Sequence, residues 1–395
     1  MDLFDKCREF KAPQMLMEKG IYPYFHALET KQDTEVVMEG INQIMLGSNN
    51  YLGLTIHPEV IEAGKNAIIE FGSGCSGSRF LNGTTKLHLE LEDELADFLN
   101  KESCVTFSAG FMSNLGAIST LAGRSDYILC DKDNHASIYD GCRLSYAKLL
   151  RYNHSDMQDL ERQLKSIPLE AGKLIVTDGI FSMGGDICKL PEIVKLAKQY
   201  NAKIMVDDAH ALGVIGEGGR GTASHFGLEK EVDIVTGTFS KSLASLGGFM
   251  VASKEVCDYV RHASRPFIFA ASITPASVQC AKTALRILRR EPERVARLKE
   301  VADYAREQLR KKGVDIRESE APIIPINTYD DEITFVACKK LFDKGVYVNS
   351  VISPAVPVGQ SIIRTSYMAT LTNEQIDRAT DIIAEVMAEL NLLKK

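Results

Sequence analysis

The stretch "GTFSKSLASLGGF", residues 237–249, places Lys241 among small residues between two strand-like segments. The segment "EVDIV" (231–235) precedes it, and "GGFMVAS" (247–253) follows it. A turn between two buried strands rarely needs a lysine between two serines. A single loop lysine is usually a solvated charge, so the residues around Lys241 decide whether it has a chemical role.

The region around this lysine alternates strand-like and helix-like runs over residues 46–285. Short β-branched runs separated by amphipathic stretches predict an α/β fold with a mainly parallel sheet covered on both faces. The strand candidates are "SCVTF" (103–107), "YILC" (127–130), "KLIVTD" (173–178), "KIMVDD" (203–208) and "DIVTGT" (233–238), with helices expected at 156–166 and 191–200.

The pattern changes on either side of this region. Residues 1–45 predict an N-terminal arm with a small hairpin, and residues 286–395 predict a smaller C-terminal α+β domain. A long helix should end at Gly313, and Thr372 with Gln375 fits a capping box for the last helix. Strands are expected at 323–328, 346–350 and 361–366, with a helix at 331–344.

Composition excludes several functional classes. The formal charge of −7 argues against an extended nucleic-acid surface. No stretch reaches the roughly 18 apolar residues of a membrane-spanning helix. Residues 1–16 are charged and lack an apolar signal core, and the nine cysteines are scattered without a CxxC pair. We expect a cytoplasmic protein with reduced thiols, without a disulfide framework or a metal site.

Polar side chains follow each strand candidate, at the sheet edge where α/β proteins bind ligands. This set contains Lys241, two histidines, an aspartate that looks buried, several hydroxyls and the start of a helix at Gly110. An amine can form a Schiff base, a carboxylate can stabilise a protonated pyridine, and a helix N-terminus can bind a phosphate. These groups suit pyridoxal 5'-phosphate as the cofactor.

The whole chain resembles the α-oxoamine synthase family of fold-type-I pyridoxal-phosphate enzymes. The segments that carry the resemblance follow one another in family order: "SNNYLGL" (48–54), "GSGCSGSRFLNGT" (72–84), "NHASIYDG" (134–141), "DGIFSMGGD" (178–186), "MVDDAHALGVIGEGGRG" (205–221), "TFSKSLASLGGF" (238–249) and "IIRTSYMATLT" (362–372). Members of this family condense an amino acid with an acyl-CoA and release carbon dioxide, and many share their active sites across a homodimer.

The resemblance assigns a role to each matching position. Lys241 would form the Schiff base, Asp207 would pair with the pyridine nitrogen, and His210 would contact the ring hydroxyl. The remaining cofactor contacts would come from His135, which stacks on the ring, and from Gly110, Phe111, Ser182, Thr238 and Ser240, with Ala270 of a second subunit offering only its backbone N–H. The substrate carboxylate would be bound by Asn50, His135 and Arg364.

The substrate preference follows from finer features of the same motifs. Ser240 before the lysine and "GSRFLNGT" favour the branch that makes 3-ketosphinganine from L-serine and palmitoyl-CoA, in the first step of sphingolipid synthesis. Ile352 counts against it, because some bacterial members of that branch carry arginine there, and "PAVPVGQ" (354–360) resembles the glycine-using acetyltransferases. A 2-amino-3-ketobutyrate ligase or an 8-amino-7-oxononanoate synthase is therefore the alternative, and an aminotransferase of the same fold is a more distant one. Peripheral membrane contact also stays open.

The candidates have ordinary structural explanations as well. Asp207 and Asp208 could both cap helices, and the two histidines could be core residues.

The GxGxxG matches at 72–77 and 216–221 do not lie between a strand and an apolar helix, so we expect turns there and no dinucleotide site. The chain has no GxSxG elbow, and a serine hydrolase is not supported. If the motifs were accidental, the chain would be an α/β binding protein.

Overall fold

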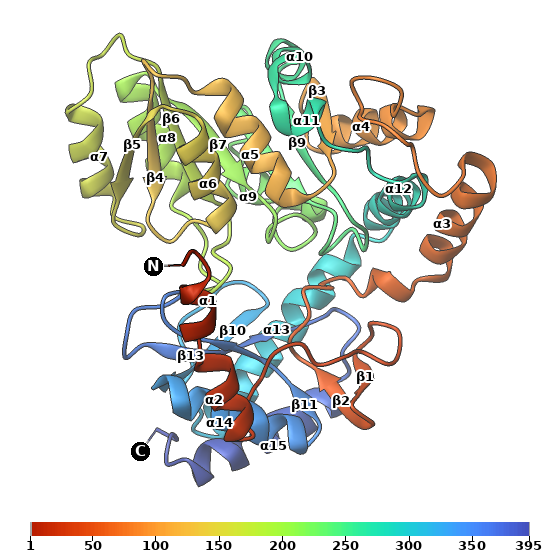
Figure 1. The fold of residues 1–395 in the computed structure, drawn as a ribbon, viewed down its shortest axis with the longest axis vertical. Helices are drawn as coiled ribbons and strands as arrows, with labels where there is room; N and C mark the ends of the chain where they lie inside the picture. Colours follow the sequence, from red (N-terminus) through yellow and green to blue (C-terminus); the bar gives the residue numbers. More distant parts are fainter. Residues whose placement is uncertain (1, 395) are drawn as a thin grey trace. The chain divides into compact units, whose positions relative to one another are not determined.

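The computed structural model describes residues 2–394 and contains two compact units (Figure 1). One unit is continuous in sequence and spans Asn49–Lys299. The other combines the N-terminal residues up to Ser48 with the C-terminal residues from Glu300 onward. The division into an N-terminal arm (1–45), a large domain (46–285) and a C-terminal domain (286–395) remains a prediction from the sequence.

The Asn49–Lys299 unit is built on a seven-stranded sheet in the order β3-β9-β8-β7-β6-β4-β5. The strands are β3 (Ser103–Phe107), β4 (Tyr127–Asp131), β5 (Lys148–Tyr152), β6 (Lys173–Asp178), β7 (Lys203–Asp207), β8 (Ile234–Thr238) and β9 (Gly248–Ala252). The five strands from β8 to β5 are parallel, whereas β9 is antiparallel to both its neighbours. The predicted mainly parallel sheet is confirmed.

Helices cover both faces of this sheet (Figure 1). The helices of the Asn49–Lys299 unit are, in sequence order, η1 (Leu54–Ile56), α3 (Pro58–Phe71), α4 (Lys86–Phe98), α5 (Gly110–Leu121), α6 (Ala136–Leu144), α7 (Met157–Lys165), α8 (Leu190–Tyr200), η2 (Glu217–Gly219), α9 (Thr222–His225), α10 (Lys254–Ala263), α11 (Arg265–Ile268) and α12 (Pro275–Arg290). One apolar core packs α5, α6, α10 and α11 against the sheet, while α7 and α8 contact strands β4, β5 and β7.

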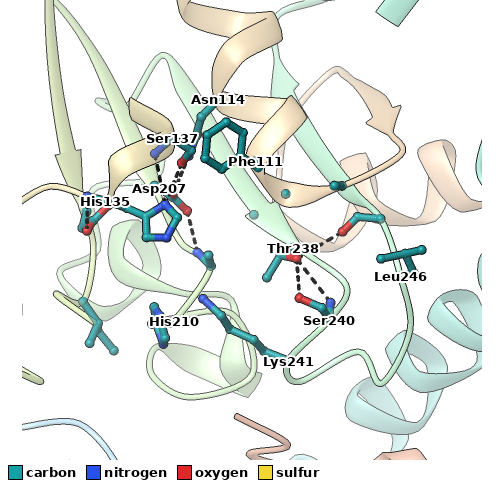
Figure 2. A pocket seen from close by; sticks show the side chains of 17 residues that line it. Phe111, Asn114, His135, Ser137, Asp207, His210, Thr238, Ser240, Lys241 and Leu246 are labelled. Carbon is teal, nitrogen blue, oxygen red and sulfur yellow. Dashed lines mark hydrogen bonds between the residues drawn. The ribbon is translucent and has the colours of Figure 1, made fainter. Parts of the chain in front are cut away.

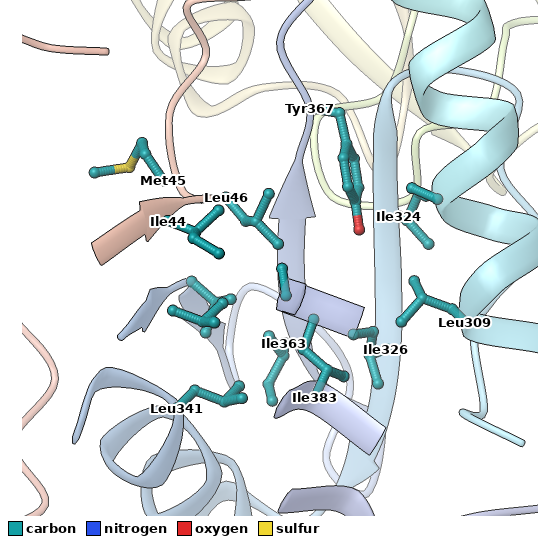
Figure 3. Close-up of a cluster of buried hydrophobic side chains, with 14 of the residues drawn as sticks. Ile44, Met45, Leu46, Leu309, Ile324, Ile326, Leu341, Ile363, Tyr367 and Ile383 are labelled. Atoms are coloured by element: carbon teal, nitrogen blue, oxygen red, sulfur yellow. The ribbon is translucent and has the colours of Figure 1, made fainter. Parts of the chain in front are cut away.

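The unit formed by the two ends of the chain has two three-stranded sheets, β1-β2-β11 and β10-β13-β12. Its strands are β1 (Glu35–Met38), β2 (Ile41–Met45), β10 (Ile323–Tyr329), β11 (Val346–Tyr347), β12 (Asn349–Val351) and β13 (Ser361–Ser366). Its helices are α1 (Asp5–Glu9), α2 (Ala12–Glu18), most of α13 (Glu293–Lys311), α14 (Asp331–Asp343) and α15 (Asn373–Glu389). Figure 3 shows side chains of its core, which come from β2, β10, β13 and three helices.

Local sequence signals account for several of these elements. β1 and β2 form the expected hairpin through Glu39 and Gly40, both at positive φ, which suits a tight two-residue turn. The predicted capping box is present, since Thr372 accepts from the Gln375 backbone and Gln375 accepts in return. Gly313 follows α13 with a φ of 74°. The predicted strand at 346–350 is two short strands, because the chain leaves one sheet after Tyr347 and enters the other.

No helix within residues 2–394 combines the length and the apolar composition that a bilayer crossing requires.

Candidate active site

A cavity of about 260 Å³ lies at the carboxyl ends of the parallel strands in the Asn49–Lys299 unit. Its lining comes from the segments that follow β3, β4, β6, β7 and β8 (Figure 2). Eight predicted site residues line it: Gly110, Phe111, His135, Asp207, His210, Thr238, Ser240 and Lys241. The fold therefore brings together residues that are up to 131 positions apart in the chain, from Gly110 to Lys241.

Asp207, the last residue of β7, is 6% exposed and firmly oriented. Its Oδ1 accepts from the Ala209 backbone N–H at 2.8 Å, and its Oδ2 accepts from Nδ2 of Asn114 at 2.6 Å. Two donors on separate carboxylate oxygens hold the side chain in one orientation.

His135 caps the N-terminus of α6 and contacts the same network. Its Nδ1 lies 2.8 Å from Oγ of Ser137 and accepts from the Ser137 backbone N–H at 3.3 Å. Burial lowers the pKa of His135; Asp207 raises it in part, and Lys241 lowers it further. The ring of Phe111 approaches it edge-on, with centroids 6.4 Å apart.

His210 is held by a buried tyrosine that the sequence motif contained without a predicted role. The Tyr51 hydroxyl lies 2.7 Å from Nδ1 of His210, and Tyr51 is fully buried. This contact on one ring nitrogen helps to fix the orientation of the imidazole.

The N-terminus of α5 and two hydroxyls form one end of the cavity. The twelve-residue helix begins at Gly110, and its first N–H groups have no partner within the helix. Oγ1 of Thr238 lies 2.9 Å from Oγ of Ser240 and also accepts from the Ser240 backbone N–H at 3.3 Å. A Cβ at Gly110 would lie 2.7 Å from Cβ of Thr238, so only glycine allows this close approach. This arrangement suits a phosphate group.

Lys241 lies in the loop from β8 to β9. The loop is closed at its base, where the Phe239 N–H donates to the Gly247 carbonyl at 2.9 Å. Gly247 has a φ of 130°, and a Cβ there would lie 2.7 Å from the Phe239 ring. The small residues thus allow a tight loop that brings the Lys241 side chain to the cavity.

Asp178, the last residue of β6, lines the cavity without having been predicted as a site residue. Its Oδ2 accepts from the His135 backbone N–H at 3.1 Å, while its Oδ1 is buried without a hydrogen-bond partner among residues 2–394. Burial raises the pKa of Asp178 well above its usual value, and the neighbouring Asp207 raises it further.

Four predicted site residues do not line this cavity. Ser182 lies in a turn closed by the bridge between Ile180 and Ile187, and Nδ2 of Asn50 donates to Oγ1 of Thr55 at 2.7 Å. Ala270 precedes the residue that pairs with Ser78. Arg364 belongs to β13 of the other unit, is 5% exposed, and donates from Nη1 to Oγ of Ser366 at 2.7 Å.

Comparison with known proteins places this geometry in a family. Residues 41–383 match the class I and II aminotransferases. A serine palmitoyltransferase of Sphingobacterium spiritivorum is 52% identical over 390 residues, which cover 99% of this chain and 98% of that one. An 8-amino-7-oxononanoate synthase of Bacillus velezensis is 43% identical and covers 98% of this chain and 97% of its own.

A solved structure of SPT with PLP internal aldimine superposes with a TM-score of 0.97 at 39% identity, over 100% of both chains. The agreement extends over the whole chain and includes every segment that contributes to the cavity. The chain belongs to the class I and II aminotransferase family, and within it to the α-oxoamine synthases that its motifs resemble.

Proposed function

We propose that this protein is a pyridoxal-phosphate-dependent acyltransferase that condenses L-serine with palmitoyl-CoA and forms 3-ketosphinganine, carbon dioxide and free CoA. The observation that carries the proposal is one cavity that combines Lys241, the oriented Asp207 carboxylate and the α5 N-terminus. This cavity lies in a chain that is 52% identical to a serine palmitoyltransferase.

The residues present fit the cofactor. The α5 N-terminus with the hydroxyls of Thr238 and Ser240 suits the phosphate, and the space there depends on the absence of a side chain at Gly110. Asp207 would hold the pyridine nitrogen, His210 the ring hydroxyl, and His135 the ring face. Pyridoxal phosphate supplies an electron sink for the charge that develops at the substrate Cα.

We assign each side chain of the cavity a separate role in the reaction. Lys241 would be the nucleophile that attaches the cofactor and, once its amine is released, the general base that takes the Cα proton. The Asp207 carboxylate would hold the ring nitrogen. A carbon–carbon bond then forms between Cα and the thioester carbonyl carbon, and the CoA thiolate leaves. Carbon dioxide departs from Cα, and Lys241 returns a proton to that carbon.

We assign the substrate carboxylate to Asn50, His135 and Arg364, on the strength of the motif match. The side chains of Asn50 and Arg364 are 4% and 5% exposed and bound to neighbours, so each is ordered before a substrate binds. Ser182 is assigned to the cofactor ring, and Ala270 to the phosphate of a partner subunit. A cytoplasmic location completes the proposal.

A homodimer is also part of the proposal, supported by exposed apolar side chains in the Asn49–Lys299 unit. Leu81 and Phe269 are 75% and 76% exposed, and Leu246 lines the cavity while remaining 60% exposed. Such side chains are often covered by another chain. Light scattering on the purified protein should give twice the 43.6 kDa of one chain; a monomer that retains full activity would contradict the dimer.

The acyl chain length tests the substrate assignment. Each buried methylene stabilises a bound acyl chain by about 0.8 kcal/mol, so kcat/KM with L-serine should rise steeply from C2 to C16 acyl-CoA. Glycine should be a poor substrate in the same series. An optimum at acetyl-CoA with glycine would instead support the 2-amino-3-ketobutyrate ligase, and an optimum with L-alanine would support the 8-amino-7-oxononanoate synthase.

A further inference from the structure

Asn114 connects two residues of the cavity lining, Asp207 and Ser137, although the sequence analysis did not identify it. It lies one turn inside α5 and is 2% exposed. Its Nδ2 donates to Oδ2 of Asp207 at 2.6 Å and to Oγ of Ser137 at 2.8 Å, and its Oδ1 accepts from Oγ1 of Thr236 at 2.8 Å. Figure 2 shows the contacts to Asp207 and Ser137 beside His135.

The direction of each hydrogen bond follows from the groups involved. A carboxylate only accepts, so the amide nitrogen of Asn114 must face Asp207 and the amide oxygen must face Thr236. Both amide protons are then committed, one to Asp207 and one to Ser137. Because Oγ of Ser137 accepts from Asn114, its own proton is directed to Nδ1 of His135, 2.8 Å away.

This relay determines the state of the His135 ring. Its Nδ1 accepts from the Ser137 hydroxyl and from the Ser137 backbone N–H, so it cannot carry a proton. The neutral ring must then hold its proton on Nε2. The charged or titratable groups around His135 are Asp207, Lys241 and Asp178, and the last of these accepts from the His135 backbone.

We propose that Asn114 is a positioning residue of this site: its amide joins the Asp207 carboxylate to the Ser137 hydroxyl and keeps His135 neutral, with its proton on Nε2. The catalytic meaning rests on the proposed function. A charged His135 would offset the negative charge of Asp207, which the protonated cofactor ring requires.

The substitution Asn114→Asp tests this relay. The Ser137 hydroxyl would donate to the new carboxylate and no longer to His135, and a second negative charge would stand near the ring. Both effects favour the imidazolium, so the pKa of His135 should rise by about one unit or more. Ring-nitrogen NMR of the full chain labelled with ¹⁵N-histidine measures this, with pyridoxal phosphate bound and after its removal. Wild-type protein should show the Nε2–H tautomer.

Ser137→Ala removes the hydrogen bond to His135 without adding a charge, so it separates the two effects of Asn114→Asp. It also tests the relay if Asn114→Asp does not fold. It removes only the hydroxyl, so the pKa of His135 should rise by a smaller amount. Ser113→Ala, a buried serine of α5 outside the cavity lining, and Asn66→Asp, on an exposed position of α3, should leave it unchanged.

The outcomes distinguish this inference from the proposed function. An unchanged pKa of His135 in Asn114→Asp, or in Ser137→Ala if only that variant folds, would overturn the relay even if the enzyme binds its cofactor and turns over. A wild-type ring protonated on Nδ1 would overturn it as well. A raised pKa in protein that does not bind pyridoxal phosphate would support the relay and reject the proposed function.

Discussion

Nε2 of His154 lies 3.0 Å from Oδ2 of Asp186, while the other ring nitrogen, Nδ1, lies 3.1 Å from Oδ1 of Asp131. A neutral imidazole has one N–H and could donate to only one carboxylate, so two carboxylate partners require the imidazolium. The ring also packs edge-on against Phe181, with centroids 4.4 Å apart. His154 therefore ties the end of β4 to the turn that follows β6.

This ion triad predicts a pH-dependent stability. Burial opposes the charge on His154, but the hydrogen bonds to Asp131 and Asp186 outweigh it and raise its pKa from 6.5 to about 10. The stabilisation is complete below about pH 6.5 and is lost as the pH rises towards 10. Urea unfolding should show His154→Gln to be less stable by on the order of 3 kcal/mol near pH 6.5, with a difference that shrinks towards pH 10.

His262→Gln is the matched control, because His262 is exposed and its Nδ1 lies 2.7 Å from an uncharged acceptor, the Asp258 carbonyl. It should change stability little at either pH. A difference between wild type and His154→Gln that stays constant from pH 6.5 to 10 would mean that His154 is not charged in the folded protein.

Gly110→Ala should weaken cofactor binding. The new Cβ would lie 2.7 Å from Cβ and 2.8 Å from Oγ1 of Thr238, and the helix N-terminus would have to move away from the hydroxyls. We expect an increase in the dissociation constant for pyridoxal phosphate of about tenfold or more, measured by titrating cofactor-free protein. Gly123→Ala, just beyond α5, has its nearest contact at 3.6 Å and should bind normally. Equal affinities for both variants would disprove the phosphate site.

The two adjacent aspartates should respond differently to replacement by asparagine. Asp207→Asn removes the charge proposed for the ring nitrogen, and kcat should fall on the order of 100-fold or more. Asp208 is buried, and its Oδ2 accepts from the Thr222 backbone N–H at 3.0 Å. Burial raises the pKa of Asp208 to about 7, so an amide replaces a side chain that is already partly neutral. A larger loss in Asp208→Asn would show that the aspartates are misassigned.

The sequence predicted strands well where they are buried on both faces. The limits of β6, and of β13 in the other unit, were predicted correctly; every residue of both strands is buried, and each strand contains adjacent β-branched residues. β5 was missed, since it lies at the sheet edge and "KLLRY" is mostly exposed or half-buried. An edge strand of this kind has no clear alternation and resembles a loop.

The sequence predicted the site residues that directly follow a strand, and it predicted the others less well. Asn114 was not predicted, because a polar residue inside a helix is ordinarily expected to be solvent-exposed. Only the tertiary structure shows that Asn114 faces Asp207. Asp178 belongs to a motif of the sequence analysis, but its raised pKa follows from burial, which no local pattern reveals. Tyr51 likewise gains its role only through its contact with His210.

Lys241→Ala should abolish turnover while the protein still folds. No other amine lines the cavity among residues 2–394, so no residue can replace the proposed covalent link. Borohydride reduction followed by peptide mass analysis should find the cofactor on Lys241 in wild-type protein and nowhere in the variant. A reducible link that survives in Lys241→Ala would place the cofactor on a different residue.

The most direct test of the whole account follows the carbon atoms of the reaction. Purified protein with pyridoxal phosphate is incubated with palmitoyl-CoA and L-serine labelled with ¹³C in its carboxyl group. The account predicts one labelled carbon dioxide for each CoA thiol released, and an unlabelled product with the mass of 3-ketosphinganine. Retention of the label in the product, or consumption of serine without release of CoA, would contradict a decarboxylative acyl transfer.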